Sequence, residues 1–172
     1  MPVSIRRAVA EDAEALAALA ARLFPLGCPE TDPADLEAYI ADELSPASIL
    51  ALIENPNVVI LVATAGEAMI AYMVIELRSP HPAIAAANRA QFRKLYVSPE
   101  WHGRGVAGEL MRAALDAVDA AGARPVWLSV FSENPRAIAF YRRYGFEIAG
   151  EQEFLVGSDR QRDFLMLRVI PG

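Results

Sequence analysis

The chain opens with alternating apolar and polar residues and then changes to a helical period. Residues 3–9, VSIRRAV, alternate in a way that is typical of a half-exposed strand. Over residues 11–24 apolar side chains recur every three or four positions, which predicts an amphipathic helix. Two shorter helical patterns begin near prolines, and we expect helices over residues 33–44 and 45–56.

The middle of the chain is richer in β-branched residues. The runs 57–63 and 68–78 enclose the turn TAGE, and this arrangement predicts an antiparallel hairpin. We expect residues 79–88 to form a surface connection and residues 89–97 to form the next strand. A helix of about residues 105–121 is predicted to follow, because its apolar positions form a single stripe.

The last third of the chain predicts a strand, a short helix and a second hairpin. Residues 125–131, PVWLSVF, have the apolar character of a buried strand. Residues 132–146 are expected to form a helix that Asn134 caps. The runs 146–156 and 160–170 flank the turn GSD and predict the closing hairpin.

The order of these elements indicates the fold class. Hairpins make their strands antiparallel, whereas a helical crossover between residues 89–97 and 125–131 makes that pair parallel. We therefore expect an α/β (α+β) fold, with a mixed, mostly antiparallel sheet and flanking helices. A length of 172 residues fits one domain, so residues 1–172 are expected to form a single domain.

Composition excludes several classes of protein. No apolar run approaches the roughly 18 residues that span a bilayer, and the first residues lack the layout of a secretion signal. The net charge of −6 argues against nucleic-acid binding. Cys28 is the only cysteine, and no cysteine–histidine pair has metal-ligand spacing. We expect a cytoplasmic protein with no metal, no membrane partner and no nucleic-acid partner.

The basic residues are unevenly distributed along this acidic chain. One short stretch holds Arg89, Arg93, Lys94, His102 and Arg104, and another holds Arg136, Arg142 and Arg143. Local clusters in an acidic protein can hold an anionic ligand, or they can be solvated faces. Charge alone leaves both interpretations open.

The segment HGRGVAGEL, residues 102–110, joins a predicted strand to a predicted helix. A helix begins with free backbone N–H groups and the positive end of its dipole. Gly103, Gly105 and Gly108 let the main chain bend and approach a ligand closely. Arg104 adds a donor for phosphate oxygens. The segment therefore favours a phosphate or pyrophosphate site, and the alternative is a tight turn whose glycines serve packing.

Two familiar phosphate-binding motifs fit this segment poorly. A Walker loop ends in Gly-Lys-Ser/Thr, whereas this loop continues as GVAGEL. A dinucleotide fingerprint has the glycine spacing found here, but it opens a regular βαβ unit with an acidic residue after the second strand. Here a predicted hairpin precedes the loop, and Glu133 is only a weak acidic candidate.

Two segments resemble the signatures of the GNAT (Gcn5-related) N-acetyltransferase family. In VSPEWHGRGVA, residues 97–107, Gly105 and Ala107 match the family's phosphate loop, while His102 stands where glutamine or arginine is usual. In NPRAIAFYRRYGFE, residues 134–147, the spacing of asparagine, tyrosine, glycine and phenylalanine is similar to the second signature. Within the family the chain looks most like bacterial polyamine acetyltransferases.

The resemblance implies acetyl-CoA as co-substrate, with its pyrophosphate on the amides of Gly103 to Gly108. It places the pantetheine arm along residues 95–97, where two parallel strands splay apart, with the Val97 N–H facing the thioester carbonyl. The cofactor-binding residues that it implies are Leu95, Tyr96, Val97, His102, Gly103, Arg104, Gly105, Val106, Ala107, Gly108, Asn134, Phe140 and Arg143.

Acetyl transfer requires a base for the amine, a donor for the thioester oxygen and a proton for the leaving thiolate. Tyr141 is the predicted acid, because a phenol with a pKa of about 10 is protonated at neutral pH. From spacing alone it could equally be one more packed aromatic residue of its helix. The resemblance at AFYRRYGF favours the role near sulfur.

The general base is less clearly indicated. Relatives often carry a glutamate on the strand before the loop, at positions that are Arg93 and Gln91 here, and neither side chain is a useful base. Glu76 is the predicted catalytic carboxylate, acting directly or through a water, and the alternative is a surface glutamate at a strand end. We assign Gln91 and Arg93 to the acceptor, whose carboxylate Arg93 could hold.

The expected function is acetyl transfer from acetyl-CoA to a primary amine of a small molecule. The acceptor is a polyamine, an amino acid or a peptide amine, and the direct mechanism is the family's usual one. The alternative is a non-catalytic CoA-binding sensor or interaction module, for which the missing strand glutamate argues. A homodimer is left open by the sequence.

Overall fold

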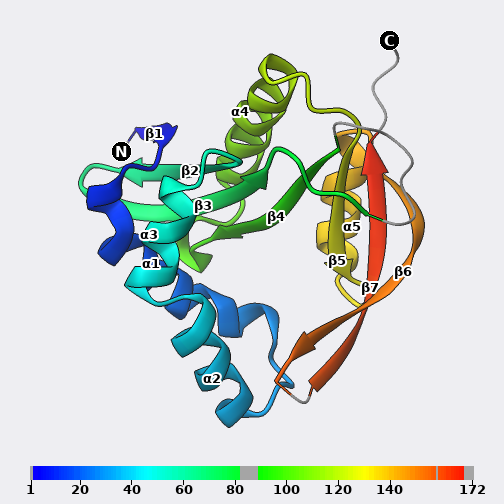
Figure 1. Ribbon diagram of the computed structural model, residues 1–172, viewed down its shortest axis with the longest axis horizontal. Coiled ribbons are helices and arrows are strands. Elements are labelled where there is room, and N and C mark those ends of the chain that lie inside the picture. The colour runs from blue at the N-terminus through cyan, green and yellow to red at the C-terminus, as the bar shows by residue number, and fades with distance from the viewer. Residues whose placement is uncertain (1, 82–88, 158, 169–172) are drawn as a thin grey trace.

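A computed structural model of the protein describes residues 2–81, 89–157 and 159–168. Its elements follow one another in the order that the hydrophobic pattern predicts, with three short 3-10 helices added. Figure 1 shows a central sheet with helices on both faces. Most of the predicted surface connection, residues 82–88, lies outside the described residues.

One seven-stranded sheet runs through the molecule in the order β1-β2-β3-β4-β5-β7-β6. Neighbouring strands are antiparallel except for β4 and β5, which are parallel. This mixed, mostly antiparallel sheet confirms the predicted fold class. The strands are β1 (Val3–Arg7), β2 (Val58–Ala65), β3 (Ala68–Glu76), β4 (Ala90–Val97), β5 (Val126–Phe131), β6 (Glu147–Val156) and β7 (Asp159–Arg168).

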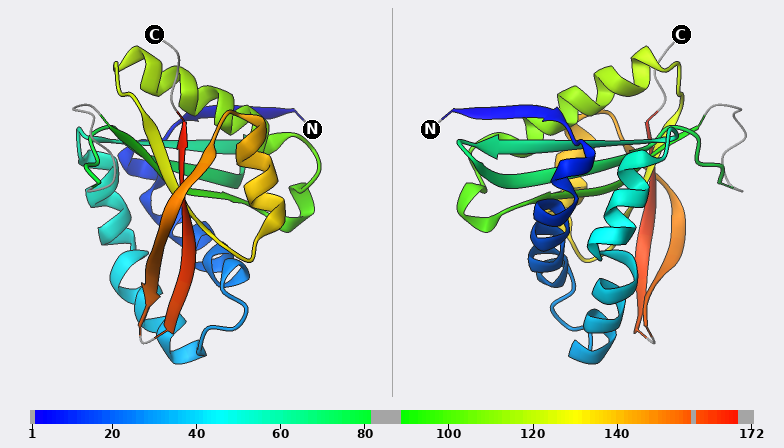
Figure 2. Two further views of the ribbon diagram at one scale, coloured as in Figure 1. Left: turned by 90° about the vertical axis from the view of Figure 1, so that its right-hand side faces the viewer. Right: turned by 60° about the vertical axis from the view of Figure 1, so that its left-hand side comes forward.

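The helices divide between the two faces of the sheet, as the two views in Figure 2 show. Helices α1, α2 and α3 lie on one face, and α4 and α5 lie on the other. The α-helices are α1 (Ala13–Leu23), α2 (Pro33–Glu43), α3 (Pro46–Glu54), α4 (Val106–Ala120) and α5 (Pro135–Arg143). The 3-10 helices are η1 (Ala10–Asp12), η2 (Phe24–Gly27) and η3 (Pro99–Trp101). None of the helices in the described ranges is long and apolar enough to cross a membrane.

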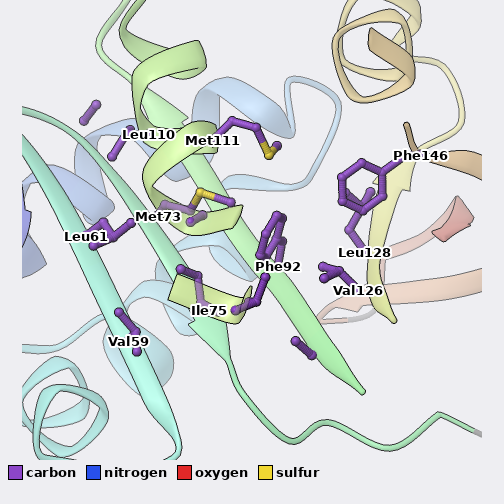
Figure 3. Close-up of a cluster of buried hydrophobic side chains, with 14 of the residues drawn as sticks. Val59, Leu61, Met73, Ile75, Phe92, Leu110, Met111, Val126, Leu128 and Phe146 are labelled. Carbon is purple, nitrogen blue, oxygen red and sulfur yellow. The ribbon is translucent and has the colours of Figure 1, made fainter. Parts of the chain in front are cut away.

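Each face of the sheet has its own hydrophobic core. On the α4 face, side chains of β2 to β5 pack against the apolar stripe of α4, as Figure 3 shows for Met73, Phe92 and Leu110. On the other face, α1 and α3 cover β2 and β3 with residues such as Leu16 and Ile49. Burial of both faces explains why β2 and β3 are almost continuously apolar.

The first strand and helix are shorter than the pattern predicts. The strand ends at Arg7, and α1 begins at Ala13. Between them residues 10–12 form a 3-10 turn, because the amide of Val9 donates to the carboxylate of Asp12 at 2.8 Å. The cap of α5 agrees with expectation. The side-chain oxygen of Asn134 accepts a hydrogen bond from the amide of Ala137 at 3.2 Å, as predicted.

The parallel pair at the centre of the sheet is short. Strands β4 and β5 pair over only three positions, from Ala90↔Val126 to Phe92↔Leu128, and then diverge. A bulge on β4 precedes the divergence, because the register with β3 skips Arg93. The bulge reverses the alternation of β4, so Phe92 packs on the α4 face while Lys94 lies among the aromatic residues of the opposite face. We call the gap beyond Phe92 the β4–β5 split.

Candidate active site

The end of β4 directs backbone groups into the β4–β5 split. The amide of Ser98 donates to the carbonyl of Ile70 on β3 at 2.8 Å. Alternate residues of an antiparallel strand direct their backbone N–H and C=O groups to the same neighbouring strand. The backbone groups of Tyr96 therefore face β3, whereas those of Leu95 and Val97 face the split. An extended ligand can hydrogen-bond to such a strand edge as an added strand does.

The turn after β4 exposes the beginning of α4. Gly103 and Gly105 have φ angles of +77° and +82°, a conformation that glycine adopts at little cost. Helix α4 begins directly after Gly105, so its first N–H groups have no partner within the helix. Gly108 has a different role, because a Cβ at this position would lie 2.9 Å from the hydroxyl of Tyr144. Helix α4 and the end of α5 are therefore closely packed.

A groove with a volume of about 640 Å³ lies between the start of α4 and α5. Its described lining combines the loop backbone with three guanidinium groups, and both features suit a diphosphate. The lining residues are Val97, Trp101, His102, Gly103, Gly105, Val106, Ala107, Gly108, Arg112, Arg136, Phe140, Arg143 and Tyr144.

A smaller cavity of about 210 Å³, which we call the passage, continues from this groove into the split. It shares Val97, Ala107 and Phe140 with the groove. It also shares residues with a third cavity, of about 310 Å³, that reaches the opposite face of the sheet. The residues common to this passage and the third cavity are Leu95, Asn134, Ala137 and Tyr141. Neighbouring cavities thus lead through the sheet.

Tyr141 lies where the passage meets the third cavity. Its ring contacts Phe140 and Phe146, with ring centroids 5.4 and 5.9 Å away. Burial raises the pKa of the Tyr141 hydroxyl to about 12. Tyr141 is therefore a neutral hydrogen-bond donor over the whole physiological pH range.

The third cavity, which we call the far cleft, is lined by side chains from both halves of the sheet. Phe24 and Tyr39 stack on each other with a centroid distance of 4.3 Å and form its aromatic wall. Most of its polar groups come from β4, β5, β6 and β7, and the others come from α2, α5 with its N-cap residue, and the residue after η2. The lining residues with polar or charged side chains are Cys28, Tyr39, Gln91, Arg93, Lys94, Tyr96, Ser129, Asn134, Tyr141, Gln152, Gln161 and Asp163.

Comparison with known proteins identifies the family. A model of the acetyltransferase (GNAT) family matches residues 14–146, which include the groove, the passage and Tyr141. The chain belongs to the GNAT family. An uncharacterized N-acetyltransferase of Mycobacterium tuberculosis is 35% identical over 159 residues, covering 91% of this chain and 97% of that protein.

More specific likenesses are weaker or cover less of the chain. A spermidine N(1)-acetyltransferase of Escherichia coli is 34% identical, but over 41% of this chain and 39% of that protein. The crystal structure of the PaiA N-acetyltransferase from Thermoplasma acidophilum, in complex with coenzyme A, superposes with a TM-score of 0.81. It shares 23% sequence identity and covers 99% of this chain and 100% of that one, so it supports the fold. This GNAT protein is an acyl-CoA-dependent N-acetyltransferase with acetyl-CoA as co-substrate.

The GNAT motif residues predicted from the sequence are mostly brought together. Nine of them line the groove: Val97, His102, Gly103, Gly105, Val106, Ala107, Gly108, Phe140 and Arg143. Leu95 and Asn134 line the passage, and Tyr96 lines the far cleft. His102 also bonds to the carbonyl of Val97 at 2.8 Å, which ties the loop to the end of β4. Arg104 lies over the ring of Trp101, 5.0 Å from its centroid, and is not among the described residues that line the groove.

The residues predicted for acceptor chemistry are partly engaged with each other. The Arg93 guanidinium lies 3.9 Å from the carboxylate of Glu76, with both side chains partly exposed. Arg93 and Gln91 line the far cleft, whereas Glu76 is not among its described lining residues. The amide oxygen of Gln91 accepts a hydrogen bond from the Ser79 hydroxyl at 2.8 Å.

Lys94, the single lysine of the chain, lies beside the aromatic wall of the far cleft. Its ammonium nitrogen is 5.8 Å from the ring centroid of Phe24 and 5.3 Å from that of Tyr39. Burial, reinforced by the nearby Arg93, lowers the pKa of Lys94 to about 8. The far cleft therefore holds a lysine that loses its positive charge only slightly above neutral pH.

Several site residues were missing from the sequence-based assignment. Arg112 and Arg136 line the groove but were not assigned to the cofactor, although Arg136 belongs to one of the basic clusters and Arg112 lies one helical turn after Gly108. Ser129 and Asp163 line the far cleft, but no motif surrounds them. No group of three or more potential metal ligands occurs within the described ranges.

Proposed function

We propose that this N-acetyltransferase moves the acetyl group of acetyl-CoA directly to a primary amine of a small molecule, within one domain over residues 1–172. The observation that carries the proposal is the meeting of two cavities at Tyr141, in the β4–β5 split. A cofactor arriving from the α4 face and an acceptor arriving from the far cleft would meet there.

On the α4 face, we propose that the diphosphate is bound by the backbone amides of residues 103–108. Arg143 adds positive charge, as do Arg112 and Arg136, which line the same groove. Along the split, the backbone groups of Leu95 and Val97 are proposed to pair with the pantetheine arm. The Val97 N–H would then stabilise the thioester oxygen as it gains charge.

We propose that Tyr141 protonates the departing thiolate. Its position at the junction of the two cavities, and a pKa raised by burial, support a donor that stays neutral. Glu76 is proposed to act through a water rather than directly, because Arg93 engages its carboxylate. Direct transfer requires both substrates to be bound together, so initial rates with both varied should give intersecting reciprocal plots. Parallel plots would indicate a covalent intermediate instead.

The acceptor is proposed to be a polyamine, an amino acid or a peptide amine. Arg93 and Lys94 both line the far cleft, and their positive charges favour an acceptor that carries a carboxylate. The pairing of Arg93 with Glu76 reduces this preference. A cytoplasmic location, a homodimer and the lack of nucleic-acid or membrane partners remain predictions from the sequence.

The experiment that tests this proposal follows free thiol from acetyl-CoA in the presence of a panel of primary amines. We expect thiol release that depends on an amine and yields the acetylated amine by mass spectrometry. Tight acetyl-CoA binding without amine-dependent thiol release across the panel would contradict the proposal and favour a CoA-binding sensor.

A further inference from the structure

Asp163 is a buried carboxylate on the wall of the far cleft. It lies on β7 between Phe131 of β5 and Gln152 of β6, and only 6% of the residue is exposed. Its Oδ2 accepts a hydrogen bond from the hydroxyl of Ser129 at 2.6 Å. Its Oδ1 is buried and has no hydrogen-bond partner among the residues that the structure describes.

No positive charge in the described part of the chain forms an ion pair with Asp163. Burial raises the pKa of this carboxyl, and the hydrogen bond from Ser129 only partly opposes that effect. The other titratable or charged residues that line the far cleft are Cys28, Tyr39, Arg93, Lys94, Tyr96 and Tyr141.

A buried carboxylate oxygen without a donor is costly, and it is a site that a positively charged donor would satisfy. Asp163 and Tyr141 line the same cavity, so a group bound at Asp163 lies on the acceptor side of the split. We infer that Asp163 binds the ammonium group of the acceptor and takes up its proton. This inference rests on the proposed function, because it assigns a role within the same acetyl transfer.

The protons balance along this route. The acceptor ammonium gives one proton to Asp163, and the resulting amine attacks the thioester carbonyl to form the new C–N bond. The C–S bond then breaks, and the thiolate takes a proton from the Tyr141 hydroxyl. The tyrosinate recovers a proton from the new amide nitrogen, and Asp163 releases its proton to solvent. The products are an N-acetylated amine, coenzyme A with a free thiol, and one proton.

Glu76 offers the natural comparison, since it is the other carboxylate considered for this role. Its oxygen lies 3.9 Å from a guanidinium nitrogen of Arg93, and 28% of its side chain is exposed. Asp163 is more buried, carries no such cation and lines the cleft itself. These differences assign the ammonium to Asp163 rather than to Glu76.

The test compares Asp163→Asn with Asp119→Asn, the same change of carboxylate to amide at an exposed position of α4, where the carboxylate lies 3.9 Å from Arg124. The probe amines are 2-phenylethylamine, putrescine, L-phenylalanine and L-phenylalaninamide, and kinetics use whichever gives the highest kcat/KM with the wild-type protein. At pH 7 we expect Asp163→Asn to lower kcat/KM for the amine roughly 100-fold. Asp119→Asn should remain within about threefold of wild type, since Asp119 is not among the described residues that line the groove or the far cleft.

The pH profile separates this role from a merely structural one. An amide oxygen cannot take up the proton of an ammonium ion, so Asp163→Asn would use only the neutral amine. Its loss of kcat/KM relative to wild type should therefore shrink to less than about tenfold as the pH approaches the amine's own pKa. A deficit in kcat/KM that is the same at every pH, a loss below threefold in Asp163→Asn, or a larger loss in Glu76→Gln, the variant of the rival carboxylate, would overturn the inference.

Two further measurements keep the result interpretable. Acetyl-CoA affinity by calorimetry should change less than twofold in Asp163→Asn, which excludes general unfolding. If that variant does not fold, the wild-type protein itself is tested with the alcohol of the same skeleton as the amine. The amine should bind to the acceptor site at least tenfold more tightly than the alcohol at pH 7, and equal binding of the two compounds would contradict the inference. Absence of any amine-dependent thiol release by the wild-type protein would instead refute the proposed function.

Discussion

On the α4 face of the β4–β5 split, the groove comes mostly from two continuous segments, residues 97–108 and 134–144, and its three glycines present only backbone. On the opposite face, the far cleft collects side chains from η2, α2 and four strands, and it reaches α5 at Tyr141. The tip of the β6–β7 hairpin also approaches α2 there, as Figure 1 shows. The two faces are therefore built in different ways.

This difference has a physical consequence. A backbone site depends on chain conformation, so it tolerates many side chains but not a change that strains the turn. A side-chain site depends on the identity of each residue and on the register that aligns the strands. We therefore expect the two faces to respond differently to substitution, and the following predictions test this comparison.

The largest effect is expected at the junction of the two faces. Tyr141→Phe removes the proton donor but keeps the ring, so kcat should fall roughly 100-fold. The affinity for acetyl-CoA should be unchanged, as measured by calorimetry. Tyr72→Phe is the matched control, because the Tyr72 hydroxyl is buried and has no hydrogen-bond partner among the described residues. Wild-type kcat in Tyr141→Phe would remove Tyr141 from the mechanism.

A smaller effect is expected from the turn on the α4 face. Gly105 and Gly122 flank α4 with φ angles of +82° and +65°, and a Cβ at either position would meet no atom within 4 Å. Gly105→Ala and Gly122→Ala should each cost about 1–2 kcal/mol of folding stability through backbone strain. Only Gly105→Ala should weaken acetyl-CoA binding, by about tenfold, or about 1.4 kcal/mol. Equal affinities in calorimetry would argue against a backbone site at this turn.

The last effect concerns folding stability rather than the reaction, and it comes from the charge of Lys94 in the far cleft. Its pKa is lowered to about 8 in the folded protein, from 10.5 ordinarily. Between these values the unfolded chain binds more protons than the folded one, so this residue makes stability rise with pH. Lys94→Met should therefore be more stable than wild type at pH 7, by on the order of 2 kcal/mol. Urea unfolding should show this advantage shrinking as the pH rises toward 10.5.

Lys94 also allows its pKa to be measured directly. Because the chain contains no other lysine, lysine-selective isotope labelling gives one side-chain signal in nuclear magnetic resonance. That signal should titrate near pH 8, and titration near 10.5 would mean that the ammonium is not desolvated.

Much of the fold followed from local pattern. The glycine turns, the prolines that begin helices and the apolar runs predicted the element order and the parallel pair correctly. The bulge at Arg93 was not predictable, because nothing in QFRKLYV distinguishes a regular strand from one that skips a partner. Yet this bulge decides that Lys94, rather than its neighbour, faces the aromatic wall.

The functional site also contains residues that local sequence pattern predicts and residues that it does not. Residues of the groove lie within contiguous motifs, so sequence reasoning could name most of them. Asp163 lies in the alternating run RQRDFLML, where any polar residue of a half-exposed strand would look alike. Its burial depends on the pairing of β7 with β5 and on the elements that cover the far cleft. Such long-range contacts leave no local signal in the chain.

The central claim is that the β4–β5 split joins a cofactor on one face to an acceptor on the other. A crystal structure of the protein with coenzyme A tests it most directly. We expect the diphosphate at the first amides of α4 and the sulfur within hydrogen-bond reach of the Tyr141 hydroxyl. A sulfur atom placed outside the split, away from Leu95 and Tyr141, would contradict the account.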